Sequence, residues 1–96
     1  MYVRVATFEG DPANVDEAIS MVRGQVASGE RPPGLESVKS MMMLVNRESG
    51  KGMGLTFFDS EEELRRGDEA LSNMNPQAGG RRTSVEVYEV AVRAED

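Results

Sequence analysis

The 96-residue chain contains no cysteine and no histidine. Without cysteine it can form no disulfide, bind no iron–sulfur cluster and offer no thiolate as a metal ligand or nucleophile. Without histidine it lacks the commonest general base and the commonest neutral metal ligand. A Ser-His-Asp triad and a haem held by a proximal histidine are therefore excluded, and we expect neither a metal site nor a bound cofactor.

Long apolar runs are missing as well. The longest unbroken run is Met41 to Val45, whereas a helix needs about 20 apolar residues to span a bilayer. The N-terminus enters an alternating strand pattern directly, with no basic segment followed by an apolar stretch. This pattern indicates no secretory signal, so we expect a cytoplasmic protein with no membrane partner.

Basic side chains are outnumbered, because 17 acidic and 11 basic residues give a formal charge of −6. An acidic surface repels phosphate backbones, so nucleic acid is not an expected partner. The length corresponds to one domain. We place that domain at residues 1–92 and assign residues 93–96 to a short C-terminal tail.

The chain does contain a regular succession of strand patterns. Runs rich in β-branched and aromatic residues predict strands over 2–8, 35–45, 53–58 and 83–92. The run MMMLV in the second strand and the run GLTFF leading through the third are apolar on consecutive residues. Such runs indicate strands that are covered on both faces.

Two helices are predicted between these strands. The first begins near Pro12, with Asp11 as its cap or, alternatively, Asn14 paired with Glu17, and it ends at Gly29. The second begins with a capping box of Ser60 and Glu63. Its apolar stripe comprises Leu64, Gly67, Leu71 and Met74, and Asn75-Pro76 ends it. Residues 77–82, which include the basic pair Arg81-Arg82, are predicted to be a solvated loop.

The resulting order β-α-β-β-α-β predicts an α+β, ferredoxin-like fold, with a four-stranded antiparallel sheet and two helices on one face. The helices can cover only that face. About five large side chains would then face water on the other face, drawn from Tyr2, Phe8, Met42, Leu44, Phe58 and Tyr88. The pattern does not settle which face each residue occupies, because a one-residue slip exchanges them. An apolar patch of this size favours a homodimer in which the sheet of a second copy covers it.

Three stretches carry a resemblance to a known family: YVRVATF at 2–8, Pro33-Gly34-Leu35, and GLTFFDSEEEL at 54–64 together with the terminal VEVYEV. Over about residues 2–91 the chain resembles the antibiotic biosynthesis monooxygenase-like group of the dimeric α+β barrel superfamily. The resemblance implies a homodimer packed sheet against sheet, with a cavity between helices and sheet in each subunit. Active members include cofactor-independent quinone-forming monooxygenases, haem-degrading monooxygenases and small isomerases or decarboxylases.

The chain departs from the family pattern at three places. Phe58 stands where the third strand often ends in tryptophan, residues 64–74 contain no histidine, and Val5-Ala6-Thr7 lacks the first-strand asparagine of haem-degrading members. These departures disfavour haem degradation. They leave open whether the protein is an enzyme at all.

Candidate pocket residues each have a functional and a structural interpretation. Arg4 could clamp an anion or a carbonyl group, it could pair with Glu86 or Glu89 of the last strand, or it could point to solvent. Gly67 could leave room for a ligand, or it could permit close packing of helix and sheet. Methionine, phenylalanine and tyrosine side chains could line a pocket, or they could fill the core and the interface. The complete candidate set is Arg4, Met42, Phe57, Phe58, Gly67, Leu71 and Tyr88.

Two functions follow as alternatives. The first is a dimeric α+β barrel protein without a catalytic set, with a small apolar ligand between helices and sheet as a candidate partner. The second is a cofactor-independent monooxygenase that acts on an aromatic substrate.

Overall fold

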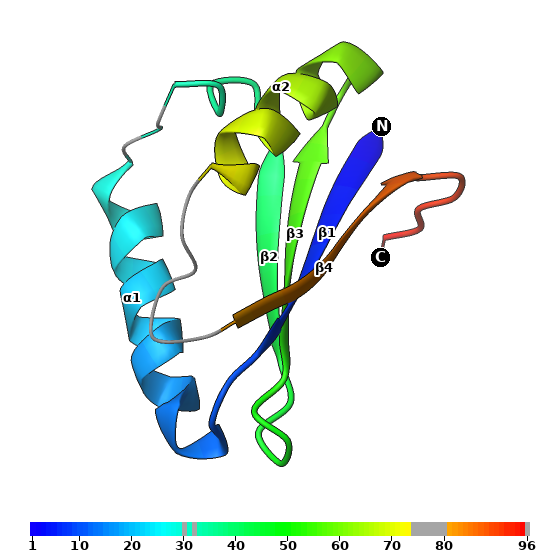
Figure 1. The fold of residues 1–96 in the computed structure, drawn as a ribbon. Coiled ribbons are helices and arrows are strands. Elements are labelled where there is room, and N and C mark those ends of the chain that lie inside the picture. Colours follow the sequence, from blue (N-terminus) through cyan, green and yellow to red (C-terminus); the bar gives the residue numbers. More distant parts are fainter. Residues whose placement is uncertain (30, 32, 74–80, 96) are drawn as a thin grey trace.

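The computed structural model describes residues 1–29, 31, 33–73 and 81–95. Within these residues the elements are β1 (Tyr2–Glu9), a 3-10 helix η1 (Pro12–Asn14), α1 (Val15–Ser28), β2 (Ser40–Val45), β3 (Gly52–Phe58), α2 (Glu61–Ser72) and β4 (Arg81–Glu89). The strands form one antiparallel sheet in the order β2-β3-β1-β4, and α1 and α2 lie on the same side of it (Figure 1). The predicted ferredoxin-like α+β fold is confirmed. No helix among the described residues has the length and apolar character that a membrane crossing needs.

Two strands differ from the prediction by more than one residue at a boundary. The second strand begins at Ser40 rather than Leu35, and the segment before it folds into the core, where Leu35 and Val38 are buried. The last strand already begins at Arg81, within the predicted loop, and ends at Glu89. Met74, the predicted break at Asn75-Pro76 and loop residues 77–80 lie outside the described residues.

The helix termini follow local capping chemistry. The Asp11 carboxylate accepts a hydrogen bond from the Ala13 amide at 2.8 Å and caps η1, which begins at Pro12. Asn14 holds the N-cap position of α1, but its side chain makes no capping hydrogen bond, so the predicted capping box with Glu17 is not formed. Gly29 ends α1 with φ 71°, the left-handed conformation that glycine adopts without steric cost. At α2, the Ser60 hydroxyl accepts a hydrogen bond from the Glu63 amide at 3.1 Å, as predicted.

Strand register assigns the two faces of the sheet. Arg4 lies opposite Thr56 and Val87, and Thr56 lies opposite Met41, which places one row of residues on the helix side. Tyr2, Phe8 and Phe58 share this side of β1 and β3, although they were expected among the residues facing water. The sequence predicted that successive residues of each strand point to opposite faces. The contact with α2 decides which of the two sets faces the helices. Met42, Leu44 and Tyr88 remain on the other side, which we call the open face.

The packed part of the core lies between α2 and one end of the sheet. The Phe58 side chain is fully buried, in a cluster with Leu35, Val38 and Leu64. Gly67 of α2 lies directly against the Phe58 ring, since a Cβ atom added there would come within 2.2 Å of Phe58 Cζ. The glycine therefore serves close packing of helix on sheet, and the ring occupies the space that a ligand would need.

We predict opposite effects for alanine at the two mid-helix glycines. Gly67→Ala should lower the free energy of unfolding by about 1–3 kcal/mol, because the new methyl group overlaps a buried ring. Gly24→Ala should raise it by up to about 1 kcal/mol, because nothing lies within 4 Å of a Cβ there and alanine favours the helix. Urea denaturation of both variants measures the difference, and a stabilising Gly67→Ala would contradict the packing described.

Candidate functional site

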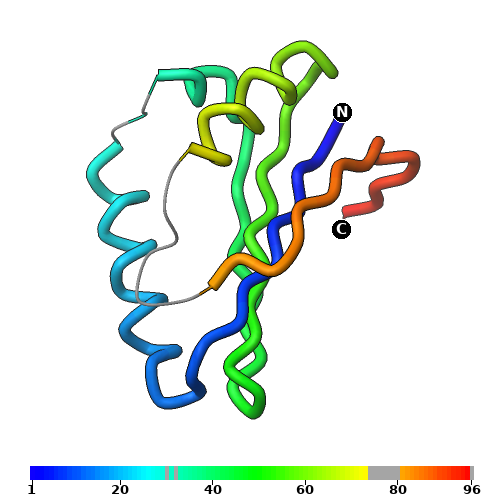
Figure 2. Tube along the Cα trace, viewed as in Figure 1, coloured from blue at the N-terminus to red at the C-terminus, as the bar shows by residue number. Residues whose placement is uncertain are grey.

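A cavity of about 690 Å³ separates α1 from the sheet. Whereas α2 packs against β1 and β3, α1 stands off, as the ribbon and the Cα trace both show (Figures 1 and 2). The apolar stripe of α1 forms one wall of the cavity. Its members are Val15, Ala18, Ile19, Val22 and Val26.

Small residues at the centre of the sheet create the hollow. Ala6 of β1 lies opposite Gly54 of β3, and the next row on the same side pairs Phe8 with Gly52. Neither glycine carries a side chain that could extend toward α1, so the space between the sheet and α1 is deepest at this point. A Cβ atom at Gly54 would make only an ordinary contact, 3.7 Å from Phe8 Cε2. Met43 and Val45 of β2 extend the apolar floor from these rows.

The size of the cavity excludes a sealed, empty void. At about 24 cal/mol per Å³, a closed void of 690 Å³ would cost about 17 kcal/mol. That cost exceeds the whole stability of an ordinary domain, which is about 5–15 kcal/mol. The space is instead partly open to solvent, so its apolar walls are accessible from outside.

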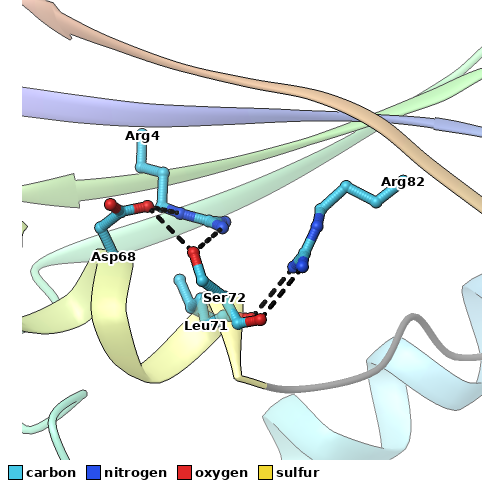
Figure 3. A network of polar contacts seen from close by, with 5 residues as sticks. All are labelled: Arg4, Asp68, Leu71, Ser72 and Arg82. Carbon is cyan, nitrogen blue, oxygen red and sulfur yellow. Dashed lines mark hydrogen bonds and ion pairs between the residues drawn. The ribbon is translucent and has the colours of Figure 1, made fainter.

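A polar network lies where the cavity meets the last turn of α2 (Figure 3). Arg4 is only 3% exposed, and its Nε donates to Asp68 Oδ1 at 2.7 Å. Arg4 Nη2 also lies 3.4 Å from Ser72 Oγ. From β4, Arg82 donates to the main-chain carbonyls of Leu71 and Ser72, each at 3.1 Å. Two arginines from different strands thus meet at the C-terminal end of one helix.

The structure places the predicted pocket residues in three different environments. Arg4, Leu71 and Met42 border the cavity. Met42 does so from a register position on the open face, since its two neighbours, Met41 and Met43, hold the positions on the helix side. Phe58 and Gly67 pack against each other instead. Phe57 and Tyr88 lie on the open face, where the Tyr88 hydroxyl donates to Glu86, and this hydrogen bond raises the pKa of the phenol.

Two interpretations of charged residues need correction. Arg4 pairs with Asp68 of α2, not with Glu86 or Glu89, because its side chain projects to the helix side while Glu86 lies on the opposite side of β4. Arg82, expected in a solvated loop, belongs to β4 and lines the cavity. This role was not predicted from the sequence, although one signal was present: Arg82 directly precedes an alternating strand pattern, and a strand that begins one or two residues earlier includes it.

Within the described part of the chain, no cluster of three or more acidic side chains is arranged to hold a metal ion. The titratable side chains bordering the cavity are mostly arginines. Apolar walls and guanidinium groups are chemically suited to holding and orienting a small molecule rather than to acid–base chemistry.

Comparison with known proteins supports the fold. No family model matches the chain, and no curated protein matches it. Among solved structures, the chain is similar to a crystal structure from Deinococcus radiodurans described as a "putative antibiotic biosynthesis monooxygenase". The match covers 100% of this chain and 98% of the other, with a TM-score of 0.58 and 9% sequence identity. At this identity the likeness concerns the fold alone.

The Arg4–Asp68 pair should matter more to stability than an exposed pair. We expect Asp68→Asn to lower the free energy of unfolding by about 1–3 kcal/mol, because it removes the carboxylate partner of a buried guanidinium. The matched control is Glu9→Gln, which breaks the Arg81–Glu9 pair at 3.1 Å, with side chains 79% and 55% exposed. It should cost less than about 1 kcal/mol. Thermal and urea unfolding measure both, and equal effects would contradict the prediction.

Proposed function

We propose that the protein binds a small apolar molecule in the cavity between α1 and the sheet. The observation that carries the proposal is the cavity itself, whose volume of about 690 Å³ falls among ligand sites of roughly 300–1,000 Å³. Its walls are chiefly apolar, with a few polar groups among them, which is the usual composition of such sites. Methionines on the floor adapt their shape to irregular ligands.

Binding without catalysis is the form of the proposal that the residues support best. The sequence contains no histidine, cysteine or tryptophan. The side chains that border the cavity are apolar, amide or guanidinium groups together with Glu9 and Thr56. None of these forms a nucleophile with an adjacent base, which acyl or group transfer requires.

A cofactor-independent monooxygenase acting on an aromatic substrate is the second candidate. The structural likeness to the Deinococcus protein favours it at the level of the fold. In such a reaction the substrate itself supplies electrons to oxygen, so the pocket needs only to hold and orient it. Oxygen uptake in the presence of bound polycyclic phenols separates the two candidates, since a pure binding protein consumes none.

Filling the cavity should abolish binding. We expect the neutral dye N-phenyl-1-naphthylamine to brighten on titration into the protein, because its emission rises in apolar surroundings. Gly54→Val should weaken that binding by at least about tenfold, or 1.4 kcal/mol, because the new side chain rises from the cavity floor. Valine also suits a strand, so the variant should stay folded.

Gly24→Ala is the control for this experiment, because that glycine does not border the cavity. It should bind the dye as the unchanged protein does. No dye binding by the unchanged protein would contradict the proposed function, and so would undiminished binding by a folded Gly54→Val variant.

We further propose that a second copy of the chain covers the open face of the sheet. Three large side chains are exposed there: Met42 at 53%, Leu44 at 42% and Tyr88 at 49%. Burying each large apolar side chain contributes about 1.5–3 kcal/mol. A twofold dimer covers both open faces at once, which is the commonest solution for such a patch.

The dimer proposal predicts twice the chain mass in light scattering at micromolar concentration. Leu44→Glu should shift the protein toward the monomer, because it places a charge within the apolar patch. Ser20→Glu adds the same charge on an exposed position of α1 and should leave the mass unchanged. A monomer mass for the unchanged protein would refute the proposal.

A further inference from the structure

The net charge of the side chains around the cavity is opposite in sign to the net charge of the whole chain. The chain carries a formal charge of −6. Among the described residues, however, the charged side chains that border the cavity are three arginines and one glutamate: Arg4, Arg23, Arg82 and Glu9. Glu9 is already paired with Arg81, which does not border the cavity. An acidic protein thus directs basic groups toward this apolar space.

These basic groups are not all balanced by carboxylates. Arg4 is matched by Asp68 at 2.7 Å. Arg82 forms no ion pair with a described residue, and its recorded partners are two neutral main-chain carbonyls. Arg23 likewise has no ion-pair partner in the described part of the chain. The cavity therefore has an excess of positive charge, concentrated in part on the half-buried Arg82.

Arg4 and Arg82 converge on the same residue. Arg4 Nη2 lies 3.4 Å from Ser72 Oγ, and Arg82 Nη2 lies 3.1 Å from the Ser72 carbonyl oxygen (Figure 3). A guanidinium has five N–H donors. Each arginine directs only two hydrogen bonds to described residues, so donors remain for a further acceptor.

We propose that the natural ligand is an apolar molecule with one carboxylate, whose anionic group binds at Arg82 beside Arg4. The inference rests on the proposed function and specifies the class of ligand. The apolar body lies along Ile19 and Val22 of α1 and over the floor at Ala6 and Gly54. A carboxylate accepts two parallel hydrogen bonds from a guanidinium, so the anion fixes which end of the molecule faces α2.

The test compares acids with neutral esters of nearly the same shape. One pair is 2-naphthoate and methyl 2-naphthoate, and a second is decanoate and methyl decanoate, used below micelle-forming concentrations. We expect each acid to bind at least about tenfold more tightly than its ester, a difference of 1.4 kcal/mol. The aromatic and linear pairs show which body the cavity prefers. Ligand fluorescence follows the naphthoates, and displacement of N-phenyl-1-naphthylamine follows the decanoates.

Arg82→Gln assigns the anchor. It should remove most of the preference for the acid and leave ester affinity within about twofold of the unchanged protein, since the apolar walls are intact. Arg65→Gln is the control: it removes an exposed arginine of α2 that neither borders the cavity nor pairs with a residue bordering it, and it should preserve the preference. Circular dichroism and the melting temperature confirm that both variants are folded.

The outcomes separate this inference from the proposed function. Equal binding of acid and ester by the unchanged protein overturns the inference and leaves the proposed function standing. Binding of neither, together with no binding of the neutral dye, overturns both. If Arg82→Gln weakens acid and ester alike in a folded protein, Arg82 acts only as a structural clamp on α2, and the inference is wrong.

Discussion

The contact between the Phe58 ring and Gly67 sets how closely α2 approaches the sheet. Because the helix has no Cβ at this point, its axis comes near enough for the ring to be fully buried beside Leu64. Among the described residues, α1 has no comparably close contact with the sheet. At the centre of its side of the sheet lie Ala6, Gly52 and Gly54, which offer almost no side chain to pack against. One sheet therefore supports a packed half under α2 and a hollow half under α1.

The arginine network occupies the boundary between these halves. Along β1, Tyr2 packs against the core cluster, Arg4 follows on the same face, and Ala6 begins the cavity floor. A buried guanidinium is tolerated here only because the last turn of α2 supplies Asp68. The same turn supplies the carbonyls that hold Arg82, where the helix dipole favours a cation. The end of α2 thus fixes the orientation of both basic groups at the cavity.

Features that depend on neighbouring residues could be predicted from the sequence, and those that depend on distant pairing could not. The caps at Asp11 and Ser60 and the stop at Gly29 follow from local chemistry, and all three are present. The partner of Arg4 could not be found this way, because Asp68 is 64 positions away on a helix whose rotation the pattern leaves free. The sequence also could not decide which side of each strand faces the helices. Alternation defines two sets of residues without saying which set contacts the helices.

The cavity was the hardest feature to predict. The apolar stripe of α1 indicated a buried face but not its distance from the sheet. The hollow depends on the register that brings Ala6 beside Gly54 and Phe8 beside Gly52, which is a property of the paired strands. Gly67 was ambiguous for the opposite reason: a glycine in an apolar stripe fits either a gap or a tight contact, and only the position of Phe58 decides between them.

The separation of the packed half from the hollow half has a consequence for how this fold can diversify. The residues that hold the chain together lie mainly under α2, whereas those that would select a ligand lie mainly on α1 and the cavity floor. Substitutions at positions such as Ile19 or Val22 can then alter ligand preference with little loss of folding. Descendants of such a protein could exchange one ligand for another by single replacements, and selection for a new ligand would seldom conflict with selection for a folded chain.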